Sequence, residues 1–143
     1  MSKIIFLDVD GVLNDGFTIL GTGKDFPTKD HLDCLKQIVD ATNAEIVLSS
    51  SWRYYPQDKN DVKNALRNVQ LQFIDVTKEL PKGRDAEIRE WLRRHPEVES
   101  YLILDDLDEF SDELKEHQVL TAFATGLLPE HVEKAIDILN KTV

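Results

Sequence analysis

The sequence has little of what marks a secreted, membrane-spanning or nucleic-acid-binding protein. Its 143 residues hold one cysteine, Cys34, which excludes an internal disulfide and favours a reducing, cytoplasmic compartment. No apolar run approaches the length of a membrane span, and the short run in MSKIIFLDVD is interrupted by Asp8 and Asp10, unlike a secretory signal. The chain has 27 acidic residues and 17 basic ones, and its formal net charge of -10 weakens the case for a general nucleic-acid binder.

Apolar patterns of two periods alternate along the chain. Continuous β-branched and aromatic runs predict buried strands at 3–9, 45–49, 71–73, 101–104 and 119–122. Apolar residues at helical spacing predict helices over about 28–42, 62–69 and 88–95, one short helix capped by Ser111, and a last helix that begins at Pro129. This alternation predicts an α/β fold: a three-layer, Rossmann-like parallel sheet with helices on both faces. We expect residues 1–143 to form a single domain.

Two of the predicted strands end in pairs of acids. Asp8 and Asp10 follow the first strand in LDVDG, and Asp105 and Asp106 follow the fourth in LILDD. Because ligands bind beyond the carboxyl ends of the strands in open α/β sheets, both pairs are expected at one crevice. Crowded carboxylates repel one another unless a hard dication neutralises them, so the sequence predicts Mg²⁺ as a cofactor bound by these four acids.

This set of residues is typical of phosphoryl-transfer chemistry. Asp8 is the candidate nucleophile, which would form an aspartyl-phosphate, and Asp10 is the candidate general acid and base. Hydroxyl and backbone N–H donors for the phosphoryl oxygens are available at Ser49–Ser51. The cation that binds the phosphate is Arg84 or Lys82, just before a predicted helix.

Four segments resemble, in order, the motifs of the haloacid dehalogenase superfamily: IFLDVDGVLN, IVLSSSWR, GRDAEIREWL and YLILDDLDEF. The likeness spans nearly the whole chain. It is greatest to the compact subgroup that carries such a domain alone or as the phosphatase module of RNA-repair proteins, including a closing segment that in this chain contains Gly126 and Leu127.

The resemblance implies a role for each matching residue. The nucleophile falls on Asp8, the acid and base on Asp10, the metal-binding acids on Asp105 and Asp106, and the phosphate-binding hydroxyl on Ser50, or on Ser49 if the register slips. Most of the superfamily has a lysine in the third motif, where this chain has Arg84, with Lys82 two positions earlier. Larger members insert a cap domain where this chain has residues 14–27 and 52–80, which leave room only for a flap and for a helix with a strand. The resemblance therefore implies a capless core with an open site.

Other interpretations remain at this point. A receiver-like signalling domain also uses an acidic pocket, Mg²⁺ and a phosphorylated aspartate, although its usual order of motifs differs, and a catalytically idle binding module can share the fold. The aromatic residues Trp52, Tyr54 and Tyr55 are expected to pack rather than to stack on a base. The expected partner is a phosphorylated substrate, whether a nucleotide, a nucleic-acid end, a phosphoprotein or a small phosphoester, and no membrane partner is expected.

Overall fold

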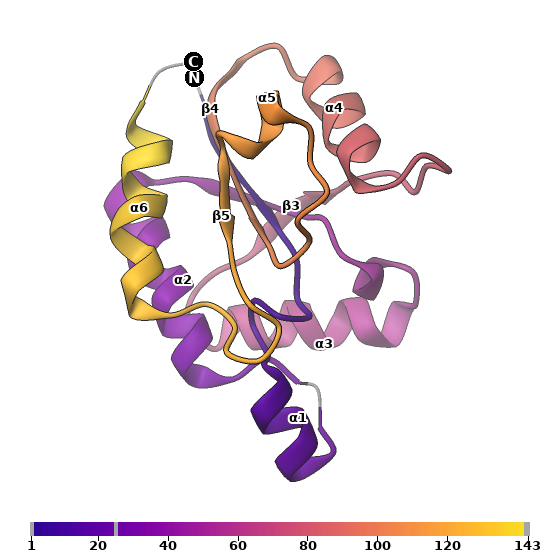
Figure 1. Ribbon diagram of the computed structural model, residues 1–143, viewed down its shortest axis with the longest axis vertical. Helices are drawn as coiled ribbons and strands as arrows, with labels where there is room; N and C mark the ends of the chain where they lie inside the picture. The colour runs from indigo at the N-terminus through magenta and orange to yellow at the C-terminus, as the bar shows by residue number, and fades with distance from the viewer. Residues whose placement is uncertain (1, 25, 142–143) are drawn as a thin grey trace.

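The computed structural model describes residues 2–24 and 26–141, in which five parallel strands form one sheet (Figure 1). The strands, in the order β3-β2-β1-β4-β5, are β1 (Ser2–Leu7), β2 (Glu45–Leu48), β3 (Phe73–Val76), β4 (Val98–Asp105) and β5 (Gln118–Leu120). Successive strands are added on one side of β1 and then on the other, so the order reverses between β1 and β4. Such a switch point is where open α/β sheets form ligand crevices.

Helices cover both faces of the sheet. The helices are α1 (Gly16–Thr22), α2 (Lys29–Thr42), α3 (Pro56–Arg67), α4 (Arg84–Arg94), α5 (Asp112–Lys115) and α6 (Pro129–Asn140), with a short 3₁₀ turn η1 (Ser51–Arg53). One apolar cluster joins the sheet to α2, α3 and α6, and a second joins it to α4 and α5. Figure 1 shows α2 beside α6 on one side of the strands and α4 with α5 on the other. The predicted three-layer α/β architecture is therefore confirmed.

Several local features differ from the sequence-based expectation. The third strand is Phe73–Val76 rather than residues 71–73, so Leu71 precedes it. The flap, residues 14–27, contains the helix α1, which the sequence did not predict. Its Phe17 and Leu20 side chains are 71% and 89% exposed, so α1 has no buried apolar stripe from which a helix could be predicted. The strand β5 is shorter than residues 119–122. The Ser111 hydroxyl does not cap α5, because it accepts a hydrogen bond from Arg89 instead. Within residues 2–24 and 26–141, no helix has the length and apolar character needed to cross a lipid bilayer.

Candidate functional site

The sheet register places three side chains level with one another just beyond the ends of β1, β2 and β3. The backbone N–H groups of Asp8, Ser49 and Thr77 continue the ladder, each donating to a carbonyl of the neighbouring strand over 2.8–3.0 Å. Asp105, the last residue of β4, stands at the same level on the other side of β1, because Leu7 pairs with Leu104. Side chains at paired positions of parallel strands point to the same face, so these four share one side of the sheet.

That side is the one covered by α4. In β1, Ile4 and Phe6 belong to the apolar cluster that includes Ile88 and Trp91 of α4, and Asp8 continues this alternation two residues beyond Phe6. Helix α4 begins at Arg84, so its first residue lies beside the acids rather than across the sheet from them.

The same alternation separates the two candidate hydroxyls. Ser49 is level with Asp8 and faces α4, whereas Ser50 is extended and points to the opposite face. The Ser50 Oγ accepts the backbone N–H of Trp52 at 3.2 Å and so caps η1. The Ser49 Oγ is buried with no hydrogen-bond partner among the described residues, and neither has the buried Thr77 Oγ1. Burying a hydroxyl without a hydrogen-bond partner costs free energy, which a ligand bonded to it would relieve. Ser49 is therefore better suited than Ser50 to bind a ligand at this site.

Three of the four predicted acids converge. Asp8, Asp105 and Asp106 each offer a carboxylate oxygen, and these oxygens lie within 4.8 Å of one another. Asp8 is 5% exposed, Asp105 is 1% exposed and Asp106 is half-buried. Three carboxylate oxygens at this spacing fit a hard dication such as Mg²⁺, which prefers oxygen ligands. The side chain of Asp10 lies outside this group in the described part of the chain.

Arg84 is the cation beside these acids. Its Nη1 lies 2.8 Å from Asp105 Oδ2 and 3.4 Å from Asp8 Oδ2. Burial alone lowers the pKa of Arg84, but the two carboxylates raise it by more, so the guanidinium stays charged. The alternative cation, Lys82, is exposed. Of the two basic residues that the sequence left open, Arg84 is therefore the one that reaches the acids.

One guanidinium does not neutralise three carboxylates. Burial and then the charge of Asp105 raise the pKa of Asp8 to about 8, even though Arg84 opposes this shift. Burial and Asp105 also raise the pKa of Asp106. The cluster therefore has an excess of negative charge that a bound dication would relieve, and carboxyl groups with raised pKa values are common at functional sites.

Asp10 is held by two donors on one oxygen. Asn14 Nδ2 donates to Asp10 Oδ1 at 2.9 Å, and Trp52 Nε1 donates to the same oxygen at 3.0 Å. Trp52 packs in the core with 6% exposure, as expected, but the sequence did not predict its hydrogen bond to Asp10 across 42 positions of the chain. An indole N–H that enters a core usually finds a polar partner, and this rule was the available signal.

A buried ion pair ties the segment after β2 to the start of α4. Arg53 Nη2 lies 2.9 Å from Glu87 Oε2, and the two side chains are 4% and 5% exposed. Arg53 Nη1 also donates to the Ser50 carbonyl at 2.7 Å, and Glu87 Oε2 accepts the Leu80 N–H at 2.9 Å. These bonds join the segments that carry Ser49 and Arg84.

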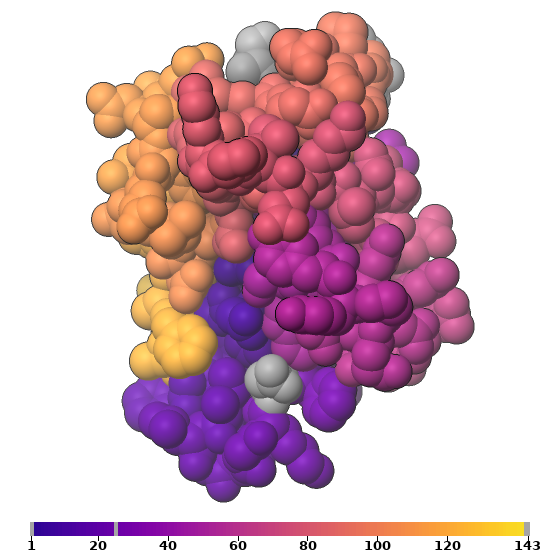
Figure 2. Space-filling view, turned by 90° about the vertical axis from the view of Figure 1, so that its right-hand side faces the viewer, coloured from indigo at the N-terminus to yellow at the C-terminus, as the bar shows by residue number. Residues whose placement is uncertain are grey.

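Gly11 allows the chain to turn directly beside the acids. Its φ of +76° favours glycine, and a Cβ at this position would overlap the Asp106 carboxylate. Figure 2 shows that the first segment of the chain, in indigo, lies in a hollow between the orange, pink and magenta segments that follow the other strands. The site is thus recessed but carries no cap domain over the described residues.

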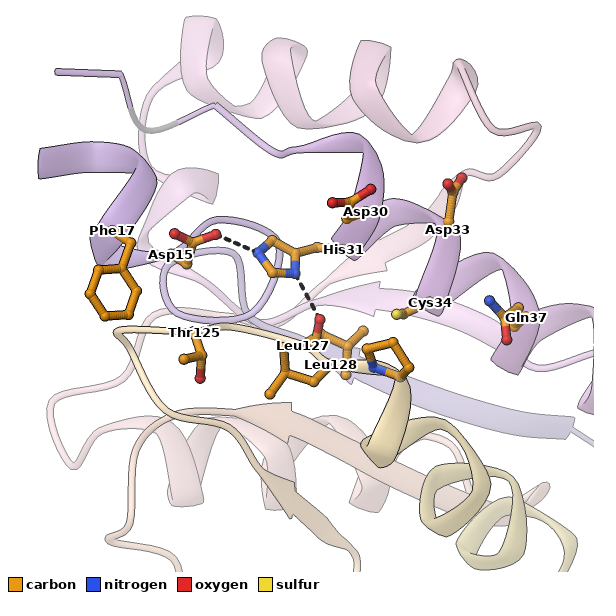
Figure 3. Close-up of a pocket in the computed structure, with 11 residues that line it drawn as sticks. Asp15, Phe17, Asp30, His31, Asp33, Cys34, Gln37, Thr125, Leu127 and Leu128 are labelled. Atoms are coloured by element: carbon orange, nitrogen blue, oxygen red, sulfur yellow. Dashed lines mark hydrogen bonds and ion pairs between the residues drawn. The ribbon is translucent and has the colours of Figure 1, made fainter. Parts of the chain in front are cut away.

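A cavity of about 490 Å³ lies behind the flap rather than over the acids (Figure 3). It is lined by residues of α1, α2 and the segment before α6. The buried His31 is one of these residues and lies between Asp15 and Leu127. The ring nitrogens of His31 lie 2.7 Å from Asp15 Oδ2 and 2.7 Å from the Leu127 carbonyl. Because a carbonyl only accepts, the nitrogen at Leu127 carries a proton. His31, which had no assigned role in the sequence, therefore anchors the base of the flap to the segment after β5.

A comparison with protein-family models places these features in a family. The model described as the HAD domain in Swiss Army Knife RNA repair proteins matches residues 4–132. The chain belongs to this family. HAD stands for haloacid dehalogenase, so the match agrees with the resemblance of the four motifs, and every residue of the acidic cluster lies inside the matched range. Searches among curated proteins and among solved structures gave no match.

Proposed function

We propose that this HAD domain is a Mg²⁺-dependent phosphatase that hydrolyses a phosphomonoester through an aspartyl-phosphate on Asp8. The observation that carries the proposal is the convergence of Asp8, Asp105 and Asp106 beside the half-buried Arg84 at the switch point of the sheet. The three acids would hold Mg²⁺, which supplies charge neutralisation for a phosphoryl group bound beside Asp8.

The first step is attack by a carboxylate oxygen of Asp8 on phosphorus. The new bond joins Asp8 to phosphorus, the bond from phosphorus to the leaving oxygen breaks, and Asp10 donates a proton to that oxygen. The Ser49 hydroxyl and Arg84 would bind the phosphoryl oxygens, in support of which the Ser49 Oγ lacks a partner among the described residues and Arg84 lies 3.4 Å from Asp8.

The second step returns the enzyme to its starting state. A water oxygen attacks phosphorus, Asp10 takes a proton from that water, and the bond between Asp8 and phosphorus breaks. The products are an alcohol and inorganic phosphate, with one water consumed. The same aspartate thus serves as acid and then as base.

The substrate is the least constrained part of this proposal. The family model is described by RNA repair, which makes an oligonucleotide with a terminal phosphate the first substrate to test. The net charge of -10 opposes general attraction of a nucleic acid, so recognition would be confined to the end near the site. Nucleotides, phosphopeptides and sugar phosphates complete the substrate screen.

The decisive experiment measures Mg²⁺-dependent phosphate release by the wild type and by Asp8→Asn. We expect many turnovers by the wild type and a loss of roughly 1000-fold or more in the variant. Asp108→Asn is the matched control, because it removes the same charge from a side chain that is 58% exposed. Equal turnover by wild type and Asp8→Asn would refute the nucleophile, and a single stoichiometric phosphorylation without release would favour a receiver-like domain.

A further inference from the structure

We infer that Trp52 and Asn14 are positioning residues that orient the carboxyl group of Asp10 and direct its proton toward the substrate. This inference rests on the proposed function, in which Asp10 is the acid and the base. Both donors reach the same atom: Trp52 Nε1 lies 3.0 Å from Asp10 Oδ1, and Asn14 Nδ2 lies 2.9 Å from it.

Two donors on Oδ1 distinguish the two oxygens of Asp10. An oxygen that accepts two N–H groups carries the negative end of the carboxyl group and is a poor position for its proton. The proton of the acid form therefore sits on Oδ2. In the first step it passes from Oδ2 to the leaving oxygen as the bond from that oxygen to phosphorus breaks, and in the second step Oδ2 takes a proton from the attacking water.

The two donors are themselves rigid. Trp52 belongs to the large apolar cluster, and its backbone N–H is bonded to Ser50 Oγ at the start of η1. Asn14 is fully buried, and its Oδ1 accepts the Gly11 N–H at 2.9 Å. Both donors are held before a substrate arrives, so Asp10 loses little freedom on reaching the transition state.

The arrangement joins two strand ends that are distant in sequence. Asn14 lies in the turn after β1, where the N–H groups of Val12 and Leu13 both donate to the Val9 carbonyl at 3.1 and 2.9 Å. Trp52 lies in η1 after β2. The orientation of Asp10 therefore depends on the packing of η1 against the first turn, and a change in either segment would misalign the acid without touching the substrate.

The test compares Trp52→Phe with the wild type on a series of aryl phosphates. A departing 2,4-dinitrophenolate needs no proton, whereas a departing phenolate does. The value of kcat/KM reports substrate binding and the first step, and not the hydrolysis of the aspartyl-phosphate. We expect Trp52→Phe to lower kcat/KM for phenyl phosphate roughly 10-fold and for 2,4-dinitrophenyl phosphate less than about 2-fold. A packing defect alone would lower both values by the same factor.

The chain offers a matched control in its other tryptophan. Trp91 is 2% exposed and its Nε1 donates to Asp75 Oδ2 at 2.8 Å, so Trp91→Phe removes an equivalent indole–carboxylate bond outside the proposed chemistry. We expect its kcat/KM values for the two substrates to keep the wild-type ratio.

Asn14→Ala is the second variant, and it decides the matter if Trp52→Phe does not fold. It should show the same dependence on the leaving group, and the double variant should lose less than the product of the two single losses, because both act through Asp10. Losses that are equal across the aryl series would overturn the positioning role while leaving the phosphatase intact. Absence of any Asp8-dependent turnover in the wild type would instead remove the proposed function, and this inference with it.

Discussion

Asp8→Asn is expected to stabilise the metal-free protein while it abolishes turnover. In the folded chain, burial and Asp105 raise the pKa of Asp8 to about 8 from an ordinary value of 3.8. A group whose pKa is raised by folding contributes stability below its unfolded value, and this contribution is lost as the pH rises toward the folded value. The unfolding free energy of the metal-free wild type therefore falls between about pH 4 and pH 8, and an asparagine removes this loss.

The structure sets the size of the effect. At pH 7 the distance from the ordinary pKa is roughly three units, and each unit corresponds to roughly 1.4 kcal/mol, which gives an upper limit of about 4 kcal/mol. Asp8 is 5% exposed, so solvent screens little of this. An amide does not reproduce every hydrogen bond of a protonated carboxyl group, a difference of about 1 kcal/mol. We therefore expect Asp8→Asn to raise the unfolding free energy by about 3 kcal/mol at pH 7.

Urea unfolding in the presence of a chelator measures this difference directly. The gain should be smaller near pH 5 than near pH 7, and saturating Mg²⁺ should stabilise the wild type more than the variant, because a carboxylate is the better ligand. Asp108→Asn, with its exposed side chain, controls for the change in net charge. If Asp8→Asn were no more stable than Asp108→Asn at pH 7 without metal, it would be refuted that burial and the charge of Asp105 raise the pKa of Asp8.

Three further outcomes follow from the surroundings of the site. Gly11→Ala should weaken Mg²⁺ binding about 10-fold or more in calorimetry, because its methyl group would displace the Asp106 carboxylate. Glu87→Gln should lower the unfolding free energy by about 3 kcal/mol in urea, because it leaves Arg53 buried without its anionic partner. Burial raises the pKa of Asp15, but hydrogen bonds from Thr18 and from its histidine partner lower it by more, so the advantage of wild type over Asp15→Asn should vanish as the pH falls below about 4.

The first two outcomes each have a matched control. Gly21→Ala should leave Mg²⁺ binding unchanged, because nothing lies within 4 Å of the added methyl group. Asp33→Asn breaks an exposed pair with Lys29 and should change stability by less than about 0.5 kcal/mol. If Gly11→Ala bound Mg²⁺ with wild-type affinity, the first expectation would be contradicted. If Glu87→Gln and Asp33→Asn lowered the unfolding free energy equally, the second would be contradicted. A constant advantage of Asp15 across the acid range would contradict the third.

Much of the fold could be predicted because its signals are local. The buried runs that became β1, β2 and β4, and the helical spacing in α2, α4 and α6, depend on neighbours a few residues apart. The helix α1 could not be predicted in this way, because its apolar side chains remain exposed and its start depends on a cap by Asp15. Tertiary contacts of the flap with residues 123 and 124 then complete its first turn.

The convergence of acids from β1 and β4 could be predicted from the sequence, although Asp10, which was predicted with them, lies outside the group that the described residues form. Asp8 and Asp105 follow buried parallel strands, and the carboxyl ends of such strands meet at one edge of the sheet. Their convergence with Asp106 was expected on that ground, and the structure brings their oxygens within 4.8 Å. Their roles in catalysis remain predictions, which the Asp8→Asn and Trp52→Phe measurements address.

The sequence by itself determined which residue types are available and, through alternation and helical spacing, the order of strands and helices that carries them to one edge. Only the tertiary structure decided how they combine there. The register of β2 against β1 turned Ser49 rather than Ser50 toward Asp8, packing of η1 brought the Trp52 indole to Asp10, and the closing segment met His31 at the base of the flap. The physical reason is range: periodicity reports contacts within one element, whereas hydrogen bonds between residues 42 or 96 positions apart exist only after the layers have packed.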